Sequence, residues 1–166
     1  MTQERAEVPT ADDLAQQAVA HVSHLVEAAQ LNASVKLTSL EGDIVNIDID
    51  GEDASLLIGR RGQVLDALQY LVLVMTTHDK YGSNRLRIHL DADGYRQRRA
   101  DSLRDLARSL ADQVRATGEE AVIEPLNALE RRIVHTELVD DPDVETYSEG
   151  EEPHRHIVIT PRRSDS

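Results

Sequence analysis

Two hydrophobic periodicities divide the first half of the chain into helices and strands. Apolar residues recur at helical spacing over residues 12–30, with Thr10 or Asp12 available as the N-cap, so this segment is predicted to be a helix. Apolar and polar residues alternate over 34–40 and 45–50, which predicts two strands. Because one face of this hairpin is apolar and the other is acidic, we expect a half-buried antiparallel sheet.

A glycine-containing turn separates these strands from a second helix. The apolar run 56–58 leads into Gly59-Arg60-Arg61-Gly62, and a helical pattern continues from there to about residue 78. A turn over 80–84 and a third strand over 85–90 are predicted to follow. The helix is predicted to have one apolar stripe made of Val64, Leu65, Leu68, Leu71, Val72 and Met75.

The second half of the chain has its own pattern. A long helix is predicted over 94–118, where Gly118 can end it in a left-handed conformation. A short strand is predicted over 121–123, and two further strands over 144–148 and 156–160. An acidic turn joins the last two strands.

Between these strands, a helix is predicted to begin at Pro125, since proline suits the first helical turn, and to continue to His135. The spacing of its residues predicts two separate faces. We expect Leu126, Leu129 and Ile133 to face the core, and Asn127, Arg131 and His135 to form an exposed polar ridge.

The glycine loop has the chemistry of a clamp for a nucleic-acid backbone. It precedes a helix N-terminus, where N–H groups lack intrahelical partners and the helix dipole is positive. Gly59 and Gly62 have no Cβ, so a sugar-phosphate chain can approach closely. Arg60 and Arg61 would hold phosphates, and Ile58 would form an apolar floor. The alternative is an ordinary turn between two packed helices.

Arg131 and His135 suggest a second nucleic-acid contact. One helical turn apart, they combine a fixed cation with a ring that can bind a phosphate or stack on a base. The spacing alone is a weak signal, because Arg85 and His89 reproduce it in the predicted third strand. The assignment of a nucleic-acid contact to Arg131 and His135 therefore depends on the residues around them.

Composition limits the class of protein. The chain of 166 residues has no Cys, Trp or Phe, so its core is aliphatic and a disulfide framework or thiolate metal site is excluded. Scarce aromatics disfavour proteins that stack bases on aromatic side chains. There is no long apolar run and no signal-peptide character, which predicts a cytoplasmic protein without membrane insertion.

The net charge of −13 is unevenly distributed. Residues 1–52 carry −8, residues 53–99 carry +3 and residues 100–166 carry −8. The one basic segment therefore contains the glycine loop, although ordinary scatter of a solubilising surface is the simpler alternative. The acidic flanks predict selective rather than indiscriminate nucleic-acid binding.

Catalytic and metal-binding arrangements are not indicated. His21 and His24 lie i, i+3 on a predicted helix without a carboxylate partner motif. His154 and His156 lie on one side of a predicted strand, with Arg155 between them. No triad order, P-loop or metal-ligand cluster stands out. We therefore expect no enzymatic activity, no cofactor and no metal.

Three segments together make the chain similar to the Jag family of SpoIIIJ-associated bacterial proteins. They are Ile58-Gly59-Arg60-Arg61-Gly62-Gln63, then Asn127 with Glu130-Arg131-Arg132-Ile133-Val134-His135, and the stretch 146–153. The resemblance covers residues 33–161. It implies a type II KH domain followed by an R-3-H (Arg-x-x-x-His) domain, both associated with RNA. It also implies a link to cell elongation and, in some members, a small single-KH partner.

The resulting prediction is an α+β protein in four parts. They are a mobile tail (1–11), an N-terminal helix with a type II KH domain (12–93), a connecting helix (94–118) and a small α/β Arg-x-x-x-His domain (119–166). We expect it to bind single-stranded RNA, with DNA left open, through residues 58–63 and through Asn127, Arg131, Arg132 and His135. The rival hypothesis is a protein-interaction adaptor that uses the KH scaffold to form a homodimer or to bind a small KH protein.

Overall fold

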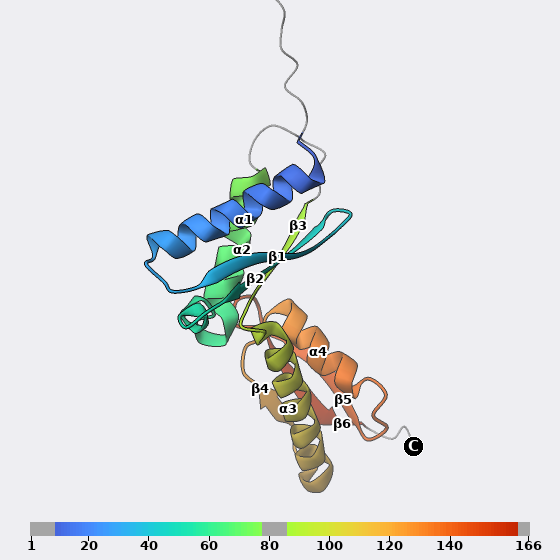
Figure 1. Ribbon diagram of the computed structural model, residues 1–166. Coiled ribbons are helices and arrows are strands. Elements are labelled where there is room, and N and C mark those ends of the chain that lie inside the picture. The colour runs from blue at the N-terminus through green and yellow to red at the C-terminus, as the bar shows by residue number, and fades with distance from the viewer. Residues whose placement is uncertain (1–8, 78–85, 163–166) are drawn as a thin grey trace, which may run out of the picture. The chain divides into compact units, whose positions relative to one another are not determined.

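The computed structural model describes residues 9–77 and 86–162 (Figure 1). The chain forms two compact units, one ending at Arg96 and the other beginning at Gln97. The predicted tail up to residue 8, the turn over 80–84 and residue 85 of the third strand lie outside the described residues. No helix in the described ranges is long and apolar enough to cross a membrane.

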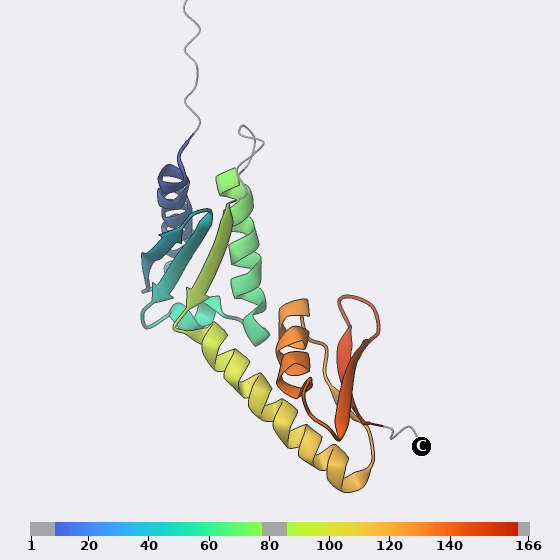
Figure 2. The ribbon, with the colours of Figure 1, turned by 90° about the vertical axis from the view of Figure 1, so that its right-hand side faces the viewer.

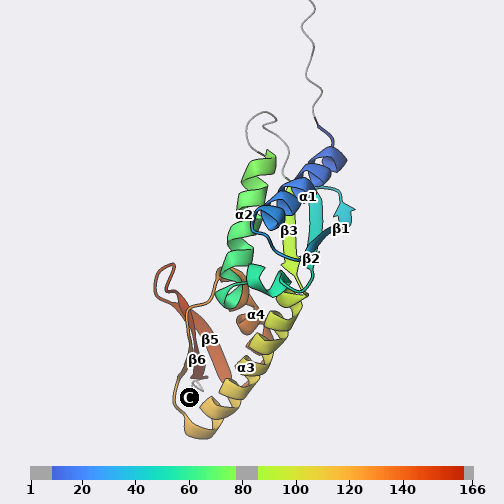
Figure 3. The same cartoon turned by 60° about the vertical axis from the view of Figure 1, so that its left-hand side comes forward.

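The first unit contains a three-stranded sheet covered by two helices. The strands are β1 (Ser34–Glu41), β2 (Ile44–Asp50) and β3 (Arg87–Ala92), in the order β1-β2-β3. β1 and β2 form the predicted antiparallel hairpin, and β3 joins β2 in parallel. Figure 3 shows α1 (Ala11–Ala28) crossing in front of the strands with α2 (Gln63–Thr77) beside it. The apolar faces of both helices and of the sheet form one core.

The start of α1 confirms the predicted N-cap. The Thr10 hydroxyl accepts a hydrogen bond from the Asp13 backbone N–H, and the Asp13 carboxylate accepts one from the Thr10 N–H at 2.9 Å. This reciprocal capping box satisfies two backbone donors that the helix itself leaves unpaired. It fixes where α1 begins over the sheet.

The predicted apolar stripe of α2 is only partly buried. Leu65 and Val72 lie in the core and Leu68 packs against it, as predicted. Val64, Leu71 and Met75 are instead exposed, with 45, 43 and 37 % of their surface accessible. The stripe is wider than the surface that the sheet and α1 cover, so one flank of α2 remains apolar and open to solvent.

The second unit is built from α3 (Tyr95–Thr117), β4 (Ala121–Ile123), α4 (Ala128–Leu138), β5 (Val144–Glu149) and β6 (His156–Pro161). Its antiparallel sheet has the order β4-β6-β5. Figure 2 shows α3 and α4 on one side of the strands. Buried residues of both helices and the strands form a second core.

Helix α3 belongs to that second core along much of its length. The sequence assigns residues 94–118 to a connecting helix, yet Leu103, Ala107, Ala111 and Val114 are buried among the residues of the second unit. Their spacing places them on one face, which a helix bridging two modules through solvent would not need. Gly118 follows α3 with φ +72°, as predicted for a left-handed helix end.

The predicted faces of α4 are wrong at Leu129 and Arg131, whereas Leu126 is buried, Ile133 packs against the core, and Asn127 and His135 are exposed, as predicted. The helix begins at Ala128 after an Asn127 N-cap, rather than at Pro125. Leu129 is 60 % exposed, whereas Arg131 is only 9 % exposed. The helix buries Glu130, Arg131, Val134 and Leu138, so its inward face is rotated by about one residue from the predicted stripe.

Candidate nucleic-acid interface

The glycine loop is a tight connection between a short helical turn and α2. The 3-10 turns η1 (Ala54–Leu57) and η2 (Arg60–Gly62) flank Ile58 and Gly59. The Ile58 carbonyl accepts hydrogen bonds from the N–H groups of Val64 at 3.2 Å and Leu65 at 3.3 Å. Ile58 itself is half-buried and packs against the core. The loop is therefore closed on the first turn of α2.

Both glycines are required by the internal packing of the loop. Gly59 has φ +69°, and a Cβ there would lie 2.3 Å from Cγ2 of Val64. Gly62 has φ +79°, and a Cβ there would lie 2.7 Å from Cε1 of Tyr95. The missing side chains thus make room for Val64 and for the Tyr95 ring, a reason that the sequence pattern did not reveal.

The two arginines of the loop have different surroundings. Arg60 is exposed, and among the described residues its guanidinium forms no hydrogen bond or ion pair. Arg61 is half-buried and adopts the left-handed conformation, with φ 55° and ψ 31°. Gln63, the first residue of α2, is exposed. The loop therefore presents Arg60 to solvent beside the positive end of the α2 dipole. The predicted unpaired backbone donors are not found there, because the N–H of Gln63 donates to the Arg60 carbonyl and those of Val64 and Leu65 donate to the Ile58 carbonyl.

Arg96 is directed at the outer edge of β3. Its Nε donates to the Leu90 carbonyl at 2.7 Å, and its terminal NH2 nitrogen lies 3.1 Å from Gln69 Oε1 and 3.0 Å from Asp66 Oδ1. Gln69 Oε1 also accepts the Leu90 N–H at 2.9 Å. These side chains satisfy the edge groups that an open strand would expose. The guanidinium of Arg96 is consequently hydrogen-bonded to groups of the first unit.

The solvent-facing side of the first sheet carries an acidic cluster. Asp48 and Asp91 are directly paired residues on the parallel strands β2 and β3. Partial burial, together with the charges of Asp91 and Asp50, raises the pKa of the Asp48 carboxyl. Lys36 and Arg87 are also exposed on this face, so the face as a whole is of mixed charge, and only the positions beside the carboxylates disfavour phosphate.

In the second unit, Arg131 is built into the structure. One terminal guanidinium nitrogen, NH1, donates to the Leu126 carbonyl at 2.6 Å. The other, NH2, donates to Glu152 Oε1 at 2.6 Å. Leu126 precedes α4, and Glu152 lies in the acidic turn between β5 and β6. The predicted exposed ridge therefore does not exist at Arg131, which instead ties these two segments together.

The other two residues of the predicted ridge have different roles, since Asn127 caps α4 and His135 faces solvent. Asn127 is the N-cap of α4: its Oδ1 accepts the Glu130 N–H at 2.9 Å, and its own N–H donates to Glu130 Oε2 at 3.1 Å. His135 is exposed, and its Nδ1 lies 2.6 Å from the Thr146 hydroxyl on β5. Arg132 is exposed on another side of α4 and has no polar partner within the described residues.

Sequence reasoning missed the partners that organise this region. The Glu130 carboxylate also accepts a hydrogen bond from Nε of Arg99 at 2.8 Å. This bond links α3 to α4. Thr146 and Glu152 lie within the stretch that carries the family resemblance, but no local pattern reveals that they contact His135 and Arg131. These contacts span 11 and 21 residues.

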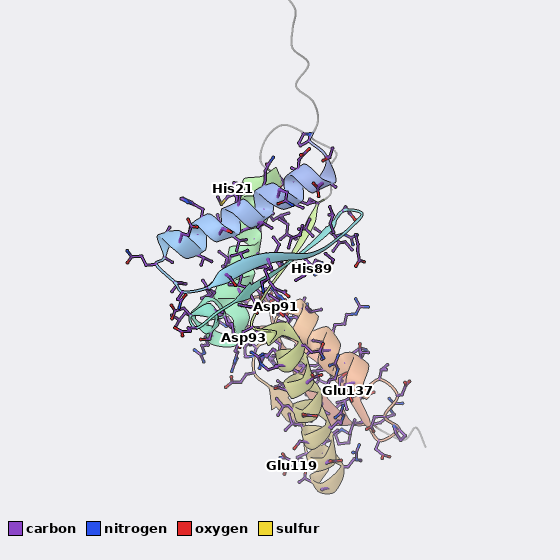
Figure 4. The ribbon with its side chains drawn as sticks, in the orientation of Figure 1. His21, His89, Asp91, Asp93, Glu119 and Glu137 are labelled. Atoms are coloured by element: carbon purple, nitrogen blue, oxygen red, sulfur yellow. The ribbon has the colours of Figure 1, made fainter. Side chains whose placement is uncertain are left out.

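The described residues contain no group of three or more His, Asp or Glu side chains placed to hold a metal ion. Of the His, Asp and Glu residues labelled in Figure 4, His89 and Asp91 share β3 and the others lie in separate segments. The labelled residues are His21 on α1, His89 and Asp91 on β3, Asp93 beyond β3, Glu119 beyond α3 and Glu137 on α4.

Comparison with known proteins identifies both units. A KH-domain family described for KhpA and KhpB matches residues 16–90, and the R-3-H domain family matches residues 101–161. The RNA-binding protein KhpB of Bacillus subtilis is 36 % identical over 153 residues, which span 91 % of this chain and 72 % of the relative. The chain belongs to the KhpB family. The predicted order of a KH domain and an Arg-x-x-x-His domain is thereby confirmed.

Other members of the KhpB family are similar over shorter parts of their length. The RNA-binding protein KhpB of Clostridium symbiosum is 41 % identical over 135 residues, covering 81 % of this chain and 60 % of the relative. The Lactiplantibacillus plantarum protein of the same name is 39 % identical, with 70 % of this chain and 36 % of the relative covered. This chain thus spans about a third to three-fifths of these two KhpB relatives. None of the three names describes an enzyme.

Proposed function

We propose that this KhpB-family chain binds single-stranded RNA and acts as a post-transcriptional regulator in the cytoplasm. The observation that carries the proposal is the glycine loop, which presents the guanidinium of Arg60 to solvent before the N-terminus of α2, without a polar partner among the described residues. Relatives similar over 81 and 91 % of this chain are named RNA-binding proteins. A role in cell elongation, which the family resemblance implies, is part of the same proposal.

In this mechanism the loop holds the backbone of the strand. Arg60 and Arg61 contact phosphates, Gln63 offers an amide at the start of α2, and Ile58 supports the loop from the core side. A KH clamp of this kind accommodates about four nucleotides. The paired carboxylates of Asp48 and Asp91 disfavour phosphates beside them, so we place the strand at the loop and the adjoining helix.

The second unit adds a separate contact through α4. His135 and Arg132 are exposed and can reach phosphates or bases, whereas Arg131 and Asn127 support them by fixing the start of α4 and the turn after β5. We therefore propose that Arg131 acts by positioning. Two linked sites of modest strength gain affinity because binding at one raises the effective concentration at the other.

Fluorescence anisotropy with short single-stranded RNA pools tests this function. The full chain is expected to bind, and the affinity is expected to fall as salt rises, because phosphate contacts release counterions. Matched DNA pools show whether the 2′-hydroxyl is recognised. A folded chain that binds neither pool below high micromolar concentration would contradict the proposal.

A protein-interaction adaptor is the second candidate, and one observation favours it. The open flank of α2 exposes Val64, Leu71 and Met75, and Tyr70 beside it is 69 % exposed. An apolar helix face of this kind suits a second KH domain, in a homodimer or in a small single-KH partner. Sedimentation of the chain and of a Leu71→Glu variant tests it: association lost in the variant supports this role, and a monomeric wild type argues against it.

A further inference from the structure

A cavity of about 210 Å³ lies between α3 and α4 in the second unit. It is distinct from the site around Arg131 and His135. His135 is directed to Thr146 on β5, whereas the cavity residues on α4 include Arg132 and Thr136, each one position later and about 100° further around the helix. The full lining is Arg104, Leu129, Arg132, Ile133, Thr136 and Glu137.

The size of the cavity limits what it can hold. Pockets for drug-sized ligands and cofactors occupy about 300–1,000 Å³. A space of about 210 Å³ suits a smaller group, such as one nucleobase or one amino-acid side chain. The choice between these two depends on the chemistry of the lining.

The cavity combines an apolar floor with a cationic rim. Leu129 leaves 60 % of its surface accessible, and Ile133 packs against the core with part of its side chain open. Arg104 is held at the rim by Asp101 Oδ1 at 2.7 Å. Arg132 is exposed and, within the described ranges, lacks any polar partner. A floor of this type favours a flat apolar face, and the free guanidinium favours an anion beside it.

The one carboxylate in the lining is held by two arginines. Glu137 Oε1 accepts a hydrogen bond from Nε of Arg108 at 2.7 Å, and Glu137 Oε2 lies 3.9 Å from Nε of Arg104. Arg104 and Arg108 also pair with Asp101 and Asp105, so this network has no positive charge to spare. Arg132 forms no ion pair within the described residues, so an anionic group of a ligand is favoured at Arg132 and not along the whole rim.

We propose that this groove, which we call the α3–α4 groove, binds one base of single-stranded RNA, with the adjoining phosphate on Arg132. The assignment rests on the proposed function and extends it to a further subsite. A base has the flat face that Leu129 and Ile133 can cover, and a guanidinium can stack on it in a chain that lacks Phe and Trp. A strand crossing α4 then contacts both His135 and the groove.

Methyl NMR of the full chain during titration with uridine or adenosine oligonucleotides of about ten nucleotides tests the assignment. The methyl groups of Leu129, Ile133 and Thr136 are expected to shift in a saturable way. Leu129→Glu places a carboxylate on the floor, and the affinity is expected to fall by about fivefold or more, the range for loss of one stacked base. Leu129→Met, which keeps the floor apolar, should retain the wild-type affinity.

Leu106→Glu is the matched control. Leu106 is an apolar residue of the same unit with 42 % of its surface exposed, and it lies about 200° around α3 from Arg104. This variant carries the same added charge and should bind like the wild type.

The outcomes separate the groove from the general function. A wild type that binds no oligonucleotide contradicts RNA binding itself. If the wild type binds but the methyl groups of these three residues do not shift, or if Leu129→Glu and Leu106→Glu bind with equal affinity, only the groove is overturned. Saturable shifts of the same methyl groups on addition of a peptide, with no shift on addition of RNA, would also overturn the groove assignment.

Discussion

The guanidinium of Arg131 and the carboxylate of Glu152 are joined by a hydrogen-bonded ion pair of 2.6 Å. The arginine side chain is 10 % exposed and the glutamate 60 % exposed, so the pair runs from the interior of the second unit to its surface. The second bond of Arg131, to the Leu126 carbonyl, fixes the segment before α4. Arg131, the arginine of the Arg-x-x-x-His motif, therefore links the segment before α4 to the turn between β5 and β6.

Replacing Arg131 is predicted to affect stability before it affects binding. Arg131→Ala leaves the Leu126 carbonyl without its donor and should lower the free energy of unfolding by about 2–3 kcal/mol. Arg131→Lys should recover only part of this, because an ammonium lacks the planar fork that reaches both acceptors. Glu152→Gln, at the exposed end, should cost less than about 1 kcal/mol.

Urea unfolding of the three variants provides the measurement. Salt-dependent RNA binding by Arg131→Ala, measured under conditions where this variant remains folded, then separates positioning from phosphate contact, because a lysine would keep the charge that sets the salt slope. If Arg131 acts by positioning, the slope of log affinity against log salt stays at the wild-type value in the variant that remains folded. A slope smaller by about 0.7 would instead make Arg131 a phosphate ligand.

Alternation and short apolar runs were sufficient to predict the strands of both units, with β6 burying three consecutive residues, Ile157, Val158 and Ile159. The side-chain period of two in β2 leaves little freedom in which face is buried, and the Thr10 cap follows from local hydrogen bonding alone. The glycine loop was also predictable, since its apolar lead-in and the helix that follows lie next to it in sequence. These features depend on neighbours along the chain.

The buried face of α4 could not be predicted in this way. Sequence reasoning places a leucine inside and an arginine outside, but Leu129 is exposed and Arg131 is buried. Burial of Arg131 is favourable only because Leu126 and Glu152 accept its hydrogen bonds, and neither partner can be assigned from spacing. The role of α3 in the second core was missed because the spacing of its apolar residues shows which face is buried and not which unit that face packs against.

The glycines of the loop offer a test of packing. Gly59→Ala and Gly62→Ala should each lower the melting temperature more than Gly42→Ala. All three positions have positive φ, so each substitution carries conformational strain of about 1 kcal/mol. A Cβ at Gly42 meets nothing within 4 Å, whereas one at Gly59 or Gly62 collides with Val64 or Tyr95.

Thermal unfolding followed by circular dichroism compares these three variants. Equal losses at all three glycines would show that conformation alone requires glycine in the loop. A larger loss at Gly59 and Gly62 supports the packing observed around Val64 and Tyr95.

The acidic cluster of the first sheet should make stability depend on pH in a defined direction. The pKa of Asp48 is raised in the folded state by partial burial and by Asp91 and Asp50. The folded chain therefore holds this proton more tightly than the unfolded chain, and the contribution of Asp48 to stability falls as pH rises from the ordinary carboxyl pKa through the raised one. Asp48→Asn should stabilise the chain at pH 7 by about 0.5 kcal/mol, because like charges on paired strand residues repel.

This gain should disappear near pH 3, where the carboxyl groups are protonated in both states. Urea unfolding at the two pH values measures it, with Glu145→Gln, which removes an exposed carboxylate on β5, as the control. An unchanged or lower stability of Asp48→Asn at pH 7 would show that Asp48 is not under electrostatic strain.

The central claim is that the glycine loop holds the phosphates of a single strand, and the salt dependence of RNA binding by an Arg60→Gln/Arg61→Gln variant tests it most directly. Loss of two phosphate contacts should weaken binding and reduce the magnitude of the log–log salt slope by about 1.4, at about 0.7 per contact. Lys36→Gln/Arg87→Gln on the exposed sheet face removes the same charge and should leave the slope unchanged. Wild-type affinity and slope in the loop variant would contradict the account.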